Sequence, residues 1–241
     1  GDSRFDKRFP SYSHLYPLYR KIEGLYQIYS SNSNENTYTN LWSGPFSGFQ
    51  SVLETFKNTE DPLRIKPINI YYHFYSGEKK SSLHAVQLAN EWSLKQDIFP
   101  LFASEYIQII NDYIHFRYKK VGKNLFKVYN GKNVKTIRFD QTNLVPDYKV
   151  SKNIIGHKFL QGSLFIYLGH KKQSLIKLSR IKKRITSPPY ILSSNVFIEK
   201  PNKIKNKINY QIRGNAKPEI LIHSTKKIIS TNPNIKLVLH D

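Results

Sequence analysis

The chain has 241 residues, and its 38 Lys and Arg residues against 17 Asp and Glu residues give a formal net charge of +21. A hydrophobic content of 39% excludes a disordered basic tail, and no apolar run approaches the ~20 residues of a membrane span. The absence of cysteine excludes disulfides, thiolate nucleophiles and zinc–thiolate sites. Because the chain begins at Gly1 and nothing at its start resembles a signal peptide, we expect it to be a piece of a longer or processed protein.

Residues 1–114 alternate short apolar runs with segments of helical periodicity. We expect strands at 25–29, 68–72 and 98–102, and helices at 45–56, from Ser81 or Ser82 to Trp92, and from Ser104 to Ile110. This order of strand, helix, strand, helix, strand and helix is typical of a βα barrel or a doubly wound sheet. The run 68–72 is apolar on both faces, as buried parallel strands are.

Residues 115–241 show short alternating runs separated by turns, and no helical period. The expected strands lie at 115–121, 125–129, 134–139, 164–168, 175–178, 195–198, 208–212, 219–222 and 235–239. Many short strands with regular turns favour a β-sandwich. The fold class that we expect is therefore α/β followed by all-β, with one domain at 1–114 and a second at 115–241.

The positive charge is concentrated in residues 151–241, which hold 18 basic and 3 acidic residues. Such a field can attract nucleic acid, anionic lipid or an acidic polysaccharide. Only 9 of the 38 cations are Arg, the residue that bidentate phosphate and base recognition favours. We therefore expect no specific nucleic-acid partner and interpret the charge mainly as a solvated surface, with lysines such as Lys203, Lys205 and Lys207 on one strand face.

His73 directly follows the apolar run 68–72. A polar residue at the carboxyl end of a parallel barrel strand lies where βα barrels place their active sites, and an imidazole there can act as a general acid or base. A histidine that is hydrogen-bonded at a strand end for structural reasons is an equally good interpretation of the spacing alone.

The loop that follows the strand at 25–29 combines amide, carboxylate and hydroxyl groups with two aromatic rings. Amides and hydroxyls can hydrogen-bond sugar hydroxyls while a flat ring covers an apolar sugar face. An ordinary polar turn with a packed tryptophan fits the same composition. The candidate substrate-binding residues of this loop are Asn34, Glu35, Asn36, Tyr38 and Trp42.

The remaining histidines lie in no metal-ligand spacing, and the chain has no GxSxG, P-loop or GxGxxG motif. We therefore name no metal-ligating residue in this sequence. The cationic stretches at Lys171-Lys172 and Arg180–Arg184 have no interleaved aromatic residues and favour a solvated face.

Three ordered blocks carry a resemblance to a known family: 33–46 (SNENTYTNLWSGPF), 66–73 (KPINIYYH) and 100–106 (PLFASEY). They resemble the deacetylase region of PelA-type proteins, the bifunctional glycoside hydrolases and polysaccharide deacetylases of Pel exopolysaccharide systems. The blocks lie within residues 1–114, and the β-rich remainder is similar to the C-terminal region of those proteins. The resemblance implies the C-terminal half of a distorted βα barrel followed by a β-sandwich accessory domain.

The resemblance also implies a reaction, the metal-dependent N-deacetylation of an N-acetylhexosamine exopolysaccharide in a biofilm matrix. His73 matches the family histidine that protonates the leaving amine, and Trp42 corresponds to an aromatic residue of the binding groove. The family's divalent metal, for which zinc is the expectation, is held by an Asp and His-His motif with no counterpart in this chain. We therefore expect this chain by itself to bind no catalytic metal and to have no deacetylase activity.

The implied partners are a polysaccharide and other exopolysaccharide biosynthesis proteins, and the implied location is periplasmic or extracytoplasmic. Two alternatives from other classes stay open. One is a non-catalytic carbohydrate-binding module, which would apply if the parent protein lacked the metal motif. The other is a basic surface protein that binds polyanions through its C-terminal third.

Overall fold

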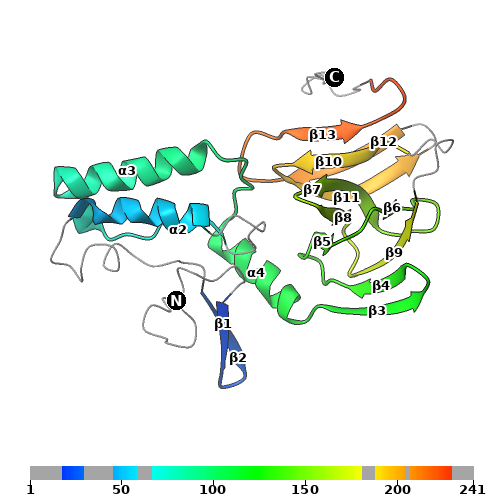
Figure 1. The fold of residues 1–241 in the computed structure, drawn as a ribbon, viewed down its shortest axis with the longest axis horizontal. Helices are drawn as coiled ribbons and strands as arrows, with labels where there is room; N and C mark the ends of the chain where they lie inside the picture. The colour runs from blue at the N-terminus through cyan, green and yellow to red at the C-terminus, as the bar shows by residue number, and fades with distance from the viewer. Residues whose placement is uncertain (1–17, 30–45, 59–66, 181–187, 205–206, 230–241) are drawn as a thin grey trace. The chain divides into compact units, whose positions relative to one another are not determined.

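The computed structural model describes residues 18–29, 46–58, 67–180, 188–204 and 207–229 (Figure 1). The chain forms two compact units, Gly1–Ile114 and His115–Asp241, here called the first and the second unit. The described part is mixed α/β with mostly β-sheet, and its strands form no closed barrel. No helix in the described ranges is long and apolar enough to cross a membrane.

The first unit contains one β-hairpin and three α-helices in its described residues (Figure 1). The hairpin turns at Glu23 and Gly24, whose φ values of 48° and 85° are those of a two-residue turn that matches the twist of the strands. The elements are β1 (Leu18–Ile22), β2 (Leu25–Tyr29), the 3-10 helix η1 (Phe46–Ser51), α2 (Val52–Asn58), the 3-10 helix η2 (Phe74–Gly77), α3 (Lys80–Leu94) and α4 (Ala103–Ile114). The three helices expected from periodicity are therefore confirmed.

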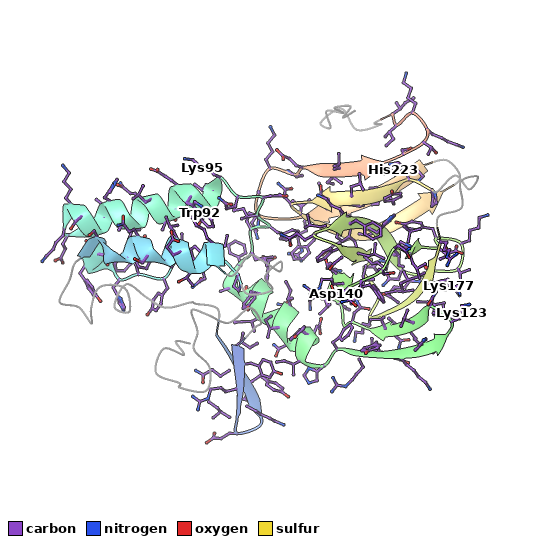
Figure 2. All side chains as sticks on the ribbon, in the orientation of Figure 1. Trp92, Lys95, Lys123, Asp140, Lys177 and His223 are labelled. Atoms are coloured by element: carbon purple, nitrogen blue, oxygen red, sulfur yellow. The ribbon has the colours of Figure 1, made fainter. Side chains whose placement is uncertain are left out.

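The apolar face predicted for the helix at 45–56 packs against α3. Phe49, Val52 and Phe56 form a buried cluster with Ala85, Val86 and Ala89, and the rings of Phe56 and Trp92 stack at 5.8 Å between centroids. Trp92 is labelled on α3 in Figure 2. Helical spacing on both partners thus produces one small core in this unit.

The start of α3 differs from the predicted cap. The N-cap residue is Lys79 rather than Ser81 or Ser82, and it makes no side-chain capping bond. The Ser82 hydroxyl lies inside the first turn and donates to the carbonyl oxygens of Ser76 and Lys79 at 2.5 and 3.0 Å. Ser82 therefore ties the preceding 3-10 helix η2 to α3 instead of beginning the helix.

The strands expected at 68–72 and 98–102 are wrong, because the structure has no strand in either range. Ile68 and Ile70 instead contact the core between α2 and α3, while the next two residues, Tyr71 and Tyr72, are exposed. An apolar run buried against helices satisfies the same pattern as a buried strand, so periodicity alone cannot separate them. The half βα barrel is consequently not confirmed in the described part of the first unit.

The second unit contains two larger antiparallel-rich sheets and a separate hairpin (Figure 1). The five-stranded sheet has the order β13-β10-β7-β8-β5, the four-stranded sheet has the order β3-β4-β9-β6, and β11 pairs with β12. The strands are β3 (Arg117–Gly122), β4 (Leu125–Tyr129), β5 (Thr136–Phe139), β6 (Val145–Pro146), β7 (Ile154–Leu160), β8 (Ser163–Leu168), β9 (Gln173–Ser179), β10 (Tyr190–Ser194), β11 (Phe197–Ile204), β12 (Lys207–Arg213) and β13 (Ile220–His223).

One core joins the two larger sheets of the second unit. Alternate residues of β4, β8 and β9 are buried in it, while the residues between them point away. The buried members are Val128, Leu164, Ile166, Leu168, Ile176 and Leu178, and four of these have no exposed surface at all. The period-2 pattern of the sequence therefore marks the inner faces of two facing sheets.

Most expected strands after residue 115 are confirmed, whereas β6, β7 and β10 were not predicted and 235–239 lies outside the described residues. The central strand β7 was missed because Gly156 and His157 interrupt its apolar pattern. Gly156 lies directly against β10, the one parallel neighbour of β7, with Ile191 as its register partner.

We predict that Gly156→Ala destabilises the second unit by about 1–3 kcal/mol, because the added Cβ would collide with the backbone carbonyl of Ile191 rather than with a movable side chain. The free energy of unfolding can be measured from amide hydrogen exchange in β7 and β8. Gly122→Ala is the matched control, since a Cβ there meets only ordinary contacts with Leu125 at 3.6 Å. Equal stability of the two variants would contradict the prediction.

Candidate functional site

His73 lies at the N-cap of η2 in the first unit, with φ −99° and ψ 155°. Its backbone carbonyl accepts a hydrogen bond from the amide of Ser76 at 3.0 Å, and its side chain is half-buried. The extended conformation of His73 marks the point where the chain turns from the run 67–72 into η2. The histidine therefore begins a short helix and does not end a parallel strand, contrary to the expectation from sequence.

Aromatic side chains surround His73 along the chain. The His73 ring stacks on that of Tyr75 at 5.1 Å between centroids and 8° between planes, and it lies 5.4 Å from the ring of Tyr71. The exposed fractions are 37% for Tyr71, 42% for Tyr72, 99% for Phe74 and 43% for Tyr75. Residues 71–75, here called the aromatic segment, thus expose four aromatic side chains around one imidazole.

The aromatic segment has the properties of a contact surface. Exposing several large rings to water is unfavourable, and contiguous exposed apolar surface commonly marks a binding site. Tyrosine and phenylalanine faces can cover the apolar face of a sugar ring, while the phenol groups offer hydrogen bonds to hydroxyls. An imidazole within such a surface can donate or accept a proton. The arrangement is therefore suited to a flat, hydroxylated ligand.

The other predicted site residues belong to the predicted loop that follows β2. The loop residues Asn34, Glu35, Asn36, Tyr38 and Trp42 all lie outside the described residues. Within the described ranges, no group of three or more His, Asp or Glu side chains is placed to hold a metal ion.

Sequence reasoning missed a second cluster of titratable rings, which lies in the second unit and is here called the tyrosine–histidine cluster. Tyr190 stacks on His157 at 4.4 Å and on Tyr148 at 5.5 Å, and its ring is 4.8 Å from that of His223. His223 is labelled in Figure 2. The Tyr148 hydroxyl and His157 Nδ1 are 2.8 Å apart and share a hydrogen bond. These four residues come from the chain after β6 and from β7, β10 and β13.

Strand register explains how the tyrosine–histidine cluster forms. His157 lies opposite the core residue Ile166, and Tyr190 lies opposite His223. Residues directly opposite on antiparallel strands share a face of the sheet. His157 is therefore on the core-facing side, where it is only 9% exposed. No local motif in the sequence indicates this cluster, because its members are spread from residue 148 to residue 223.

Burial favours the uncharged forms of His157, Tyr148 and Tyr190. Burial, with a smaller contribution from the nearby His223, lowers the pKa of His157 to about 4. Burial also raises the pKa of Tyr148 far above its ordinary value, with smaller contributions from Tyr190 and Tyr210. A neutral imidazole that is held by a hydroxyl and stacked on a phenol ring is a structural arrangement, and we assign the cluster no catalytic role.

Comparison with known proteins gave no matching family model, no matching curated protein and no matching solved structure.

We predict that the second unit loses about 2 kcal/mol of stability as the pH falls from 7.5 to 5. An unfolded histidine binds a proton near its ordinary pKa of 6.5, whereas folded His157 stays neutral down to about pH 4, so acidification favours the unfolded state. Amide exchange of β7 and β8, corrected for the intrinsic rate, measures this loss. Both tryptophans, Trp42 and Trp92, lie in the first unit, so their fluorescence would not report it.

Two variants distinguish His157 from other groups that titrate in this range. His157→Phe keeps a ring against Tyr190 and should remove most of the pH dependence. His170→Gln replaces an exposed histidine and should leave the pH dependence of stability unchanged. A pH dependence that survives His157→Phe would show that another group causes it.

Proposed function

We propose that this chain is a carbohydrate-contacting part of a metal-dependent polysaccharide N-deacetylase that acts on an N-acetylhexosamine polymer. The observation that carries the proposal is the aromatic segment, in which Tyr71 and Tyr75 flank His73 and the neighbouring rings of Tyr72 and Phe74 are exposed. The reaction class comes from the resemblance of the sequence blocks around Trp42, His73 and Ser104 to PelA-type deacetylases.

In this proposal the two units belong to different domains of the enzyme. Residues 1–114 belong to the C-terminal half of a distorted βα barrel, and residues 115–241 form a β-sandwich accessory domain. The facing sheets of the second unit, with their shared core, support the second assignment. The protein would act in the periplasm or outside the cell, beside other proteins of exopolysaccharide synthesis.

His73 would act as the general acid. Hydrolysis of an N-acetyl group breaks the bond between carbonyl carbon and nitrogen, and the departing amine needs a proton. An imidazole can donate that proton near neutral pH, and the stacked ring of Tyr75 would hold its plane. A divalent metal supplies the activated water in such reactions. The described residues offer no ligand set for it, so the metal would be held by residues elsewhere in the parent protein.

A non-catalytic carbohydrate-binding module is the second candidate. It uses the same exposed rings of the aromatic segment and needs neither a metal nor a proton donor. The two candidates differ in whether His73 affects turnover or only binding.

We predict that His73→Ala lowers deacetylation about 10²–10⁴-fold in a protein that carries this chain together with a complete metal motif, because the amine then leaves without a positioned acid. Release of acetate from an N-acetylhexosamine polymer measures the rate, with folding and metal content checked in parallel. His84→Ala changes an exposed histidine on α3 and serves as the control. Near-normal turnover of His73→Ala would contradict the catalytic role and leave the binding module.

We predict that Tyr72→Ala and Phe74→Ala each weaken binding of N-acetylhexosamine oligomers about three-fold to ten-fold, since an aromatic contact contributes about 0.5–1.5 kcal/mol. Titration calorimetry on the full chain can measure the dissociation constants. Phe102→Ala removes another exposed ring of the same unit, 64% exposed, and should not change them. If all three variants bind like the unchanged chain, the aromatic segment does not contact the polymer.

A further inference from the structure

The outer face of the four-stranded sheet carries most of the charge of its strands. In β4, Phe126 and Val128 point to the core, so Lys127 and Tyr129 point to the opposite, outer side. In β9 the same alternation places Lys177 between the buried residues Ile176 and Leu178. The core thus determines which side chains the sheet presents on its outer face.

Register gathers cations from four segments onto this outer face. Lys119 lies opposite Lys127, Lys127 lies opposite Leu175, and Leu175 forms a bridge with Lys152. These four residues form a row across the sheet. Its ends, Lys119 and Lys152, are three strand spacings of about 4.8 Å apart, which is about 14 Å. We call the face formed by Arg117, Lys119, Lys127, Lys152, Lys177 and Tyr129 the cationic sheet face.

The remaining members of the cationic sheet face lie in the adjacent rows. Arg117 is opposite Tyr129, and Tyr129 is opposite Gln173. Lys177 lies one row farther on, and its Nζ donates to the carbonyl oxygen of Lys123 at 2.7 Å (Figure 2). The Nζ of Lys127 lies 5.2 Å from the centroid of the Tyr129 ring. The face is therefore an array of four lysines and one arginine with an aromatic ring among them.

Repulsion between these cations lowers the stability of the sheet, so folding stability does not explain why they lie together. Like charges directly opposite each other, such as Lys119 and Lys127, destabilise a strand pair, and the sequences of β3, β4 and β9 contain no acidic residue. The acidic residue beside this face is Asp147, which follows β6 and whose backbone amide donates to the carbonyl oxygen of Lys177 at 2.8 Å. Lysines on edge strands do discourage aggregation. That explanation applies to the edge strand β3, but not to Lys127 and Lys177, which lie on inner strands of the sheet.

We propose that the cationic sheet face binds a linear acidic polysaccharide that carries carboxylate groups. A row of ammonium groups about 14 Å long matches a chain with repeated single negative charges, and counterion release would favour the association. The Tyr129 ring, 38% exposed, adds a flat surface for a sugar ring, and exposed Gln173 beside it offers hydrogen bonds to hydroxyls.

Other occupants fit the cationic sheet face less well. Base recognition in nucleic acids favours arginine, and only Arg117 of the five cations is one. An anionic membrane would use the charges but not the Tyr129 ring within the array. A polymer with free amines would be repelled. The proposal concerns the second unit alone and does not depend on the function proposed for His73.

The test uses alginate, a polymer of uronic acids, and the full chain at about 0.15 M salt. The triple variant Lys119→Gln, Lys127→Gln and Lys152→Gln removes the row, and we expect alginate affinity to fall about 10-fold to 100-fold. The control triple, Lys80→Gln, Lys95→Gln and Lys226→Gln, makes the same change of net charge at exposed positions elsewhere and should change affinity less than three-fold. Equal losses in both triples would show attraction by net charge alone and would overturn the proposal.

A second comparison separates polysaccharide from other polyanions. Tyr129→Ala should weaken alginate binding about three-fold to ten-fold and leave binding of poly-L-glutamate, which has no sugar rings, unchanged. Unchanged far-ultraviolet circular dichroism and melting would confirm that the variants fold. Tighter binding of single-stranded DNA or of vesicles with 30% phosphatidylserine than of alginate would overturn the choice of partner. So would equal effects of Tyr129→Ala on both probes.

Discussion

The core shared by β4, β8 and β9 determines almost everything else in the second unit. Side chains alternate with a period of two along a strand, so burying Val128 and Ile176 at once exposes Lys127 and Lys177 on the other side. A shift of register by one residue would place these lysines in the core, where an unpaired charge is very costly. The charged surface is therefore a consequence of the same register that buries the core.

The same layer between the sheets holds the tyrosine–histidine cluster, where the packing changes from aliphatic to aromatic and polar. A buried imidazole is tolerated there because its ring nitrogen is hydrogen-bonded to the Tyr148 hydroxyl and because the rings of Tyr190 and Tyr148 lie against it. Neutrality is the condition for this arrangement, since protonation of His157 would place a charge in a desolvated position. The buried imidazole of His157 thus couples the stability of the second unit to pH.

Local patterns predicted the local structure, and long-range contacts account for what they missed. Helical spacing from Phe49 to Phe56 was sufficient to predict a helical segment, which the structure divides into η1 and α2, because this spacing does not depend on what the helix packs against. The strand predicted at 68–72 was wrong because apolar side chains in this range can be buried against helices as well as in a sheet. The rings of His157 and His223 lie near Tyr190 only through the pairing of β7, β10 and β13, which no sequence spacing encodes. The aromatic segment, being contiguous, could be read from the sequence, although not the stacking of His73 on Tyr75.

The two proposed surfaces place opposite electrostatic demands on a polymer. In our proposal the aromatic segment would contact its ligand through exposed rings, which favour neutral sugar faces and are insensitive to salt. The cationic sheet face would attract carboxylates and repel protonated amines, and this attraction would weaken as salt screens the charges. Deacetylation converts a neutral amide into an amine that gains a positive charge on protonation, so a product of the proposed reaction would be repelled by the second unit. If both proposals hold, the aromatic segment and the cationic sheet face would therefore bind two different polymers, the first a substrate that is deacetylated and the second an acidic polysaccharide.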